Sequence, residues 1–197
     1  MSKGRLEAFS DGVIAILITI MVLELKIPEG SDLLALRPVV PVFLAYVLSF
    51  VVLGIYWNNH HHMLHACDRI NGKVLWANLH LLFWLSLIPA VTAWMGETGS
   101  APVPTAIYGG VLLLAGVAYY ILTTTLVGLL GPHSALAIAV GKDVKGILSV
   151  VFYAGAIPLA FVGPWIADAI YVIVVLMWLV PDRRIERNLN TSHHPTR

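Results

Sequence analysis

The chain has 197 residues, of which 58% are hydrophobic and only 12% are charged, with a formal net charge of +1. Soluble domains carry about a quarter charged residues, so this composition and a mean hydropathy of +0.83 exclude a protein whose main solvent is water. The near-neutral charge provides no field for a polyanion, and nucleic acid is not an expected partner.

Six long apolar segments, separated by Gly, Pro and charged residues, predict six transmembrane helices in a single membrane domain covering residues 1–197. The predicted helices span approximately residues 6–27, 38–64, 73–95, 105–130, 143–162 and 164–181. Pro89 and Pro158 are expected to kink the third and fifth. Barrel strands need only about ten alternating residues, so the run lengths favour an all-α integral membrane protein.

The first predicted helix carries polar side chains at its start, where Ser10 and Asp11 enter the membrane early. At about 100° per residue, one stripe of this helix holds Ile16, Thr19, Ile20, Leu23 and Ile27, with Arg5 and Phe9 roughly on its extension, and Asp11 lies about 140° away from Ile16. We therefore expect Asp11 to point into the bundle. Intramembrane carboxylates are rare and are usually paired or functional, so a hydrogen-bond network and direct ion binding are both open. An apolar stripe alone is typical of any lipid-facing or core-facing surface.

Histidines are concentrated at the end of the second predicted helix, which reads Tyr56-Trp57-Asn58-Asn59-His60-His61-His62-Met63-Leu64-His65. His61 and His65 share a helix face, and Asp68 follows about one turn later. Two imidazoles at this spacing can converge on zinc or another divalent ion, which makes His61, His65 and Asp68 weak metal-site candidates.

A structural interpretation of the same histidines is also open. In this interpretation His60 or His61 hydrogen-bonds to Ser10 or Asp11 across the first helix pair, and Asn78 and His80 on the third helix are further network candidates. Tryptophans lie mostly toward the segment ends, as interfacial anchors do.

The distribution of Lys and Arg predicts that both termini are cytoplasmic, because cytoplasmic loops carry an excess of these residues. An even number of crossings gives ten basic residues inside and two outside. The inner set is Lys3, Arg5, Arg69, Lys73, Lys142, Lys145, Arg183, Arg184, Arg187 and Arg197, and the outer set is Lys26 and Arg37.

Two motifs connect the chain to a known family. The first is Arg5-x-x-x-Phe9-Ser10-Asp11-Gly12-Val13-Ile14-Ala15-Ile16, and the second, on the next helix, is Tyr56-Trp57-x-x-His60-His61. In both motifs the chain resembles the transmembrane protein 175 family, whose members are potassium channels of endolysosomes and bacteria. The resemblance implies a potassium-permeable channel in the cell membrane, with four identical six-helix subunits assembled around a central pore and no cofactor.

The resemblance also implies roles for individual residues. The first helix would line the pore, with Ile16, Ile20 and Leu23 forming its apolar constriction and Thr19 as a secondary candidate. A structural network would hold this helix upright, and its implied members are Arg5, Phe9, Ser10 and Asp11 with His60 or His61.

Functions of other classes stay open at this point. No Ser/His/Asp triad, P-loop, HExxH or glycine-rich nucleotide fingerprint occurs, so an enzyme is not expected. The eight histidines leave a histidine-dependent metal-ion transporter, or a haem-binding or metal-binding membrane protein, as the main alternative, and a purely structural membrane subunit as another.

Overall fold

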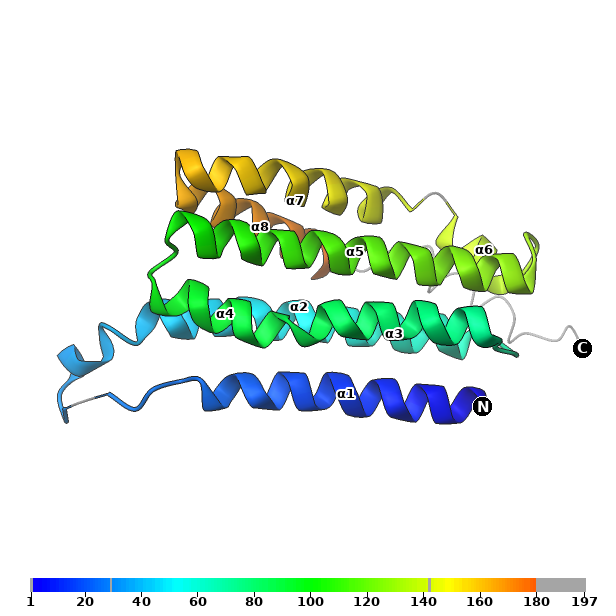
Figure 1. The fold of residues 1–197 in the computed structure, drawn as a ribbon, viewed down its shortest axis with the longest axis horizontal. Helices are drawn as coiled ribbons and strands as arrows, with labels where there is room; N and C mark the ends of the chain where they lie inside the picture. Colours follow the sequence, from blue (N-terminus) through cyan, green and yellow to red (C-terminus); the bar gives the residue numbers. More distant parts are fainter. Residues whose placement is uncertain (1, 29, 142, 180–197) are drawn as a thin grey trace, which may run out of the picture.

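The computed structural model describes residues 2–28, 30–141 and 143–179, and within them the chain forms a bundle of α-helices (Figure 1). Long helices alternate in direction, so α1, α3 and α7 begin, and α2 and α5 end, at one end of the bundle, which we name the amino-terminal end. The elements are α1 (Lys3–Leu23), a 3-10 helix η1 (Leu33–Leu36), α2 (Val40–His65), α3 (Gly72–Ser86), α4 (Ile88–Glu97), α5 (Pro102–Leu130), α6 (Ala135–Val140), α7 (Val144–Val162) and α8 (Pro164–Leu179).

The predicted fold class is confirmed. Five helical segments are long and apolar enough to cross a bilayer, with α3 and α4 counted as one segment, and α8 is a shorter apolar helix within the described residues. Residues 180 and 181 of the sixth predicted helix lie outside the described residues.

The two prolines that were expected to kink helices have different positions in the structure. The segment predicted as 73–95 consists of α3 and α4, which meet at Leu87. Pro89 occupies the first turn of α4, where its missing N–H costs no intrahelical bond. Pro158 lies inside α7, which continues to Val162.

The first helix is shorter than predicted at its carboxyl end. It ends at Leu23 rather than near residue 27, so Ile27 belongs to the following connection. Lys26 in this connection forms an ion pair with Glu97 at the end of α4, with an Nζ–Oε1 distance of 2.7 Å. The connection thus leaves the helix axis to reach α4.

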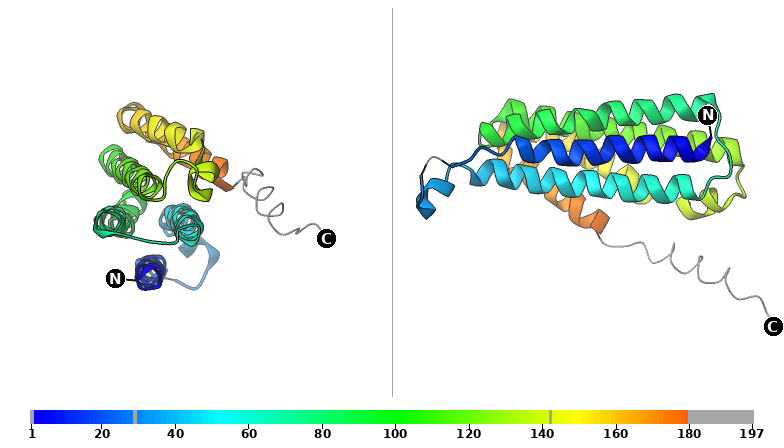
Figure 2. Two further views of the ribbon diagram at one scale, coloured as in Figure 1. Left: turned by 90° about the vertical axis from the view of Figure 1, so that its right-hand side faces the viewer. Right: turned by 90° about the horizontal axis from the view of Figure 1, so that it is seen from below.

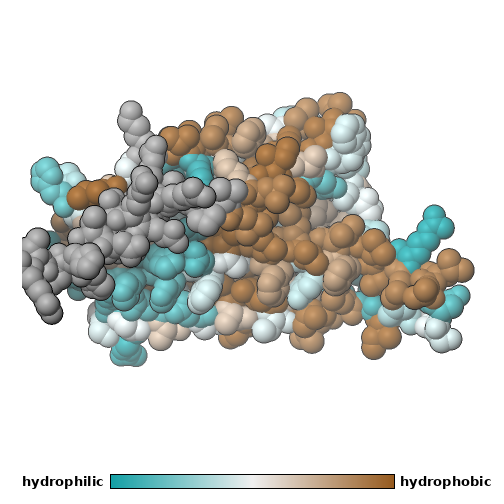
Figure 3. All heavy atoms as spheres, turned by 180° about the vertical axis from the view of Figure 1, so that it is seen from behind, coloured by the Kyte–Doolittle hydropathy of each residue, from teal (hydrophilic) through white to brown (hydrophobic). Residues whose placement is uncertain are grey.

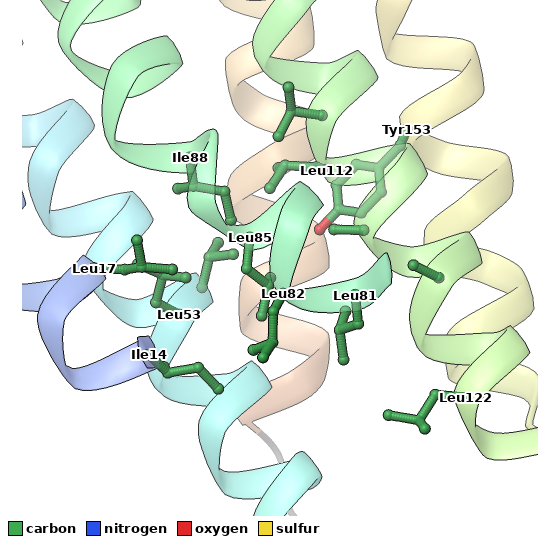
Figure 4. Close-up of a cluster of buried hydrophobic side chains, with 14 of the residues drawn as sticks. Ile14, Leu17, Leu53, Leu81, Leu82, Leu85, Ile88, Leu112, Leu122 and Tyr153 are labelled. Atoms are coloured by element: carbon green, nitrogen blue, oxygen red, sulfur yellow. The ribbon is translucent and has the colours of Figure 1, made fainter. Parts of the chain in front are cut away.

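An apolar core holds the first four helices together. Ile14 and Leu17 of α1 point into a cluster with Leu53 of α2, Leu85 of α3 and Ile88 of α4 (Figure 4). The side chains of Ile14, Leu53, Leu85 and Ile88 are fully buried. This cluster fixes one side of α1 against the bundle.

A second group of contacts fixes α5 by hydrogen bonds near its start. The Ser49 hydroxyl lies 2.6 Å from that of Thr92 and 2.9 Å from that of Tyr108, which joins α2, α4 and α5. The Tyr171 hydroxyl donates to the Thr105 carbonyl oxygen at 2.9 Å and ties α8 to α5. Gly109 lets the two helices approach, because a Cβ at this position would overlap the Tyr171 hydroxyl.

The surface pattern agrees with a protein that crosses a bilayer. Figure 3 shows an apolar belt across the middle of one face, with hydrophilic residues gathered toward the two ends. In the end-on view of Figure 2, α1 lies at the edge of the bundle beside α2.

Candidate ion pathway

The predicted stripe on α1 is not covered by the rest of the subunit. The exposed fractions are 57% for Ile16, 41% for Ile20 and 79% for Leu23, and Thr19 is also exposed. The buried residues of α1 are Leu6, Ser10, Ile14, Leu17 and Met21. The helix therefore has a packed face, formed by these five residues, and an open face that holds the stripe.

The Thr19 hydroxyl is hydrogen-bonded to the backbone of its own helix. Its hydroxyl lies 3.1 Å from the carbonyl oxygen of Ala15 and 2.9 Å from that of Ile16, so its proton is donated to the helix backbone. The hydroxyl oxygen keeps two lone pairs, which can accept a hydrogen bond or contact a cation.

The packed face is connected by a buried three-residue hydrogen-bond chain. Asn78 Nδ2 of α3 donates to Ser10 Oγ of α1 at 3.0 Å, and His60 Nε2 of α2 donates to Asn78 Oδ1 at 2.7 Å. All three side chains are buried. His60 Nδ1 is buried without a hydrogen-bond partner among the described residues. The chain Ser10–Asn78–His60 joins three helices at one level of the bundle.

Asp11 has a different partner from the one expected. Trp57 Nε1 donates to Asp11 Oδ1 at 3.1 Å, and the Trp57 ring stacks on His61 with ring centroids 6.0 Å apart. His61 in turn stacks on His65 at 6.1 Å. Next to these three stacked rings, Lys3 Nζ donates to the His65 carbonyl oxygen at 3.1 Å. The first half of α1 is thus fastened to the last turns of α2.

These contacts correct the predicted network in two places. A direct bond from His60 or His61 to Ser10 or Asp11 does not form among the described residues, because Asn78 bridges His60 to Ser10 and Trp57 reaches Asp11. Trp57 was expected only as an interfacial anchor, although its spacing of four residues from His61 already placed it on the same helix face. Arg5 and Phe9 are exposed, and Arg5 forms no ion pair or hydrogen bond with the described residues.

The histidine run does not form a metal centre within one described chain. No group of three or more His, Cys, Asp or Glu side chains within residues 2–28, 30–141 and 143–179 is placed to hold a metal ion. His61 and His65 are exposed and stacked in parallel, with an interplanar angle of 14°, and Asp68 is exposed in the connection to α3. The metal-ion alternative therefore gains no support from this geometry.

Together these features define a helical membrane protein whose first helix is anchored on one face and open on the other. The family model described as "Endosomal/lysosomal potassium channel TMEM175" matches residues 5–89, which include both sequence motifs. A potassium channel of Chryseobacterium sp. (strain P1-3) is 52% identical over 192 residues, covering 98% of this chain and 100% of that protein. The chain belongs to the TMEM175 family, a family of ion channels and not of enzymes.

More distant relatives match parts of the chain or its fold. The human endosomal/lysosomal proton channel TMEM175 is 38% identical over 96 residues, which are 42% of this chain and 19% of that protein. The crystal structure of a lysosomal potassium-selective channel TMEM175 homolog from Chamaesiphon minutus has a TM-score of 0.77 and 27% identity, covering 90% of this chain and 96% of that chain. The described fold is therefore shared over almost its whole length with a channel.

Proposed function

We propose that this chain forms a potassium-permeable channel in which the first helices of four identical subunits surround one pore. The observation that carries the proposal is the open face of α1: Ile16, Ile20 and Leu23 are exposed in the subunit while the opposite face is firmly packed. One subunit cannot enclose a conduit with a single helix, whereas a closed ring of copies can. We infer that the ion is potassium because the relatives are named as potassium channels.

The residues of the open face determine what such a pore can do. Rings of Ile16, Ile20 and Leu23 offer no oxygen ligands, so they would act by narrowing the path and removing water from it, which is the property of a hydrophobic gate. Selectivity would then follow the dehydration cost of the ion and favour potassium over the more strongly hydrated sodium by a modest factor. A ring of Thr19 hydroxyls beside the gate would replace part of the lost water.

The contacts on the packed face support a structural role for the motif residues, which would hold the pore helix in a fixed orientation. The rotation of α1 about its own axis is fixed by the chain Ser10–Asn78–His60 and by the Asp11–Trp57 bond. Both form only when the side of α1 that carries Ser10 and Asp11 faces α2 and α3. Rotation determines which side chains face the axis. Arg5 and Phe9 continue the open face toward the amino-terminal end and would contact other subunits or the pore entrance rather than this network.

The same proposal places the protein in the cell membrane as a multi-pass protein with both termini cytoplasmic. Among the described residues, the basic side chains at the amino-terminal end outnumber those at the other end. The former are Lys3, Arg5, Arg69, Lys73 and Lys145, and the latter are Lys26 and Arg37. Lys142, Arg183, Arg184, Arg187 and Arg197 lie outside the described residues.

A flux assay tests the proposal. The purified chain in liposomes should pass potassium faster than sodium, and Ile16→Asn should raise the leak and reduce ion discrimination, because an amide keeps the constriction wet. Ile173→Asn is the matched control, since Ile173 of α8 has a similar exposed fraction, 52%, far from α1. Absence of ion flux, or unchanged conductance and selectivity in Ile16→Asn, would contradict the proposal. Cross-linking in the membrane that stops short of four copies would contradict the tetramer.

A further inference from the structure

The bundle contains a cavity that is separate from the α1 stripe. The cavity has a volume of about 290 Å³ and lies among α2, α5, α7 and α8. Ile55, Tyr56 and Asn59 of α2 line it, whereas Trp57 and His60 of the same helix face α1 and α3. None of the proposed pore residues contributes to its wall.

The wall changes from polar to apolar along the helices. Polar groups gather near the amino-terminal end, where Asp143 caps the start of α7 and Ser149 Oγ accepts from Trp178 Nε1 at 2.9 Å. Toward the other end, the lining includes Tyr153 and valines of α2 and α8. From Asp143 to Tyr153 the helical rise is about 15 Å. This is the polarity gradient of one membrane leaflet, from the interface toward the bilayer centre.

The cavity is open on a flank of the bundle that is apolar. Tyr120 of α5 and Ile147 and Val151 of α7 border it, and all three side chains are exposed. In a bilayer, hydrocarbon chains surround an apolar flank of this kind. A polar solute from water would lose its hydration in the cavity and find few partners on an aliphatic and aromatic wall.

The charged side chains near the cavity opening, one acidic and one basic, favour neither an anionic nor a cationic ligand group. Asp143 supplies a carboxylate, whose Oδ1 accepts from the Gly146 backbone N–H at 2.9 Å. Lys145, which lies beside the lining rather than in it, supplies an ammonium 5.9 Å from the centroid of the Trp178 ring. Recognition must therefore come from the shape and apolarity of the cavity.

We propose that this cavity binds one acyl chain of a phospholipid from the leaflet at the amino-terminal end of the bundle. The chain would enter between the exposed side chains of α5 and α7, with its methyl end toward Tyr153. Binding at this site does not depend on the proposed function of α1.

Gly116 provides a way to fill the cavity without disturbing its wall. It lines the cavity, and a Cβ at this position would lie 3.8 Å from both Tyr56 Oη and Val150 Cγ2, which is ordinary van der Waals contact. Gly116→Leu therefore directs its added atoms into the empty volume. Gly128 is the matched control on the same helix, because it is outside the cavity lining and has no atom within 4 Å of an added Cβ.

Photolabelling tests the proposal on the full chain. Liposomes of phosphatidylcholine, with a small fraction carrying a diazirine in the middle of one acyl chain, are irradiated, and the adducts are mapped by peptide mass spectrometry. We expect adducts on the cavity wall at Tyr56 or Tyr153 in the unmodified chain and in Gly128→Leu. Gly116→Leu should lose these adducts while it keeps those at the exposed Ile173. Val150→Phe fills the same space from α7 and guards against a folding defect of the first variant.

Two results would overturn the proposal. The first is labelling of the unmodified chain restricted to exposed residues such as Ile173, which is also the result if a second copy of the chain covers the cavity opening. The second is labelling of Tyr56 or Tyr153 that persists in both filled variants, because the label would then have reached these residues by another route.

Discussion

The helices α1 and α5 are both apolar and long enough to cross a bilayer, yet the bundle holds them in different ways. α5 packs against α3, α4, α7 and α8 and buries twelve residues along its length. α1 lies at the edge of the bundle, contacts α2, α3 and α4, and buries five residues on a single face (Figure 2). Most of the surroundings of α5 therefore come from the subunit itself, whereas the surroundings of the open face of α1 come from outside the subunit.

Access to water gives the largest expected contrast and separates a pore-lining face from a lipid-facing one. Burial raises the pKa of the Cys67 thiol, in the connection after α2, to about 11. At pH 8 only ~0.1% of such a thiol is ionised, against about a quarter of a solvated thiol with a pKa near 8.5. Ile20→Cys replaces a large apolar side chain of the proposed constriction by a smaller and more polar one, which admits water. This thiol should therefore react with a charged methanethiosulfonate roughly a hundredfold faster than Cys67.

The pH dependence of this labelling supplies the internal control. Only the thiolate reacts, and a raised pKa moves its formation to higher pH, so the rate at Cys67 should rise about tenfold per pH unit from pH 8 to pH 10. The rate at Ile20→Cys should level off near pH 9. Equal, slow rates at both positions would mean that the open face of α1 contacts lipid.

The two faces of α1 should also differ in their contribution to the free energy of unfolding. Ile14 is fully buried in the core cluster, and Ile14→Ala should destabilise the subunit by about 2–4 kcal/mol through lost contacts and a cavity. Ile16→Ala, on the open face, should change stability by less than about 0.5 kcal/mol while it alters ion flux. Reversible unfolding in mixed micelles measures the first quantity and liposome flux the second. A large loss of stability in Ile16→Ala would place that side chain in a packed interface.

The close contact of α5 with α8 predicts a smaller change in the free energy of unfolding for a substitution in α5. Gly109→Ala should destabilise the subunit by about 1–3 kcal/mol, because the added methyl group overlaps the Tyr171 hydroxyl. Its neighbour Gly110 has no atom within 4 Å of an added Cβ, so Gly110→Ala should be neutral or stabilise by up to about 1 kcal/mol. Unfolding of both variants under the same conditions checks the difference. Equal stabilities would mean that α8 does not approach α5 as described.

The sequence predicted the class of fold and the stripe of α1 because both depend on local information. Segment length identifies a membrane helix, and the periodicity of 3.6 residues places Ile16, Ile20 and Leu23 on one side of it. The end of α1 at Leu23 was not predicted, since Lys26 turns toward Glu97 from a distant helix. Periodicity also cannot say whether a stripe meets lipid, protein or water.

The network on the packed face was predicted in its members but not in its connections. Ser10, Asn78 and His60 were all recognised as candidates, yet their bonding depends on the relative heights of three helices, which no single helix encodes. Trp57 illustrates the same limit. Its indole could have served as an interfacial anchor, and only the approach of α1 to α2 makes it the partner of Asp11.

The smallest effect concerns this network and tests whether it fixes α1. Ser10→Ala leaves Asn78 Nδ2 without its acceptor and should destabilise the subunit by about 1 kcal/mol, since hydrogen bonds between membrane helices contribute about 0.6 kcal/mol on average. Asn78→Leu removes both bonds of the bridge. In a double-mutant cycle the two changes should be non-additive by at least about 0.5 kcal/mol. Thr98→Ala is the control, because its exposed hydroxyl bonds only to its own helix. Additive effects of Ser10→Ala and Asn78→Leu would show that the bridge does not couple α1 to α3. The orientation of the open face would then have to depend on the Asp11–Trp57 bond and on the apolar contacts of Ile14 and Leu17.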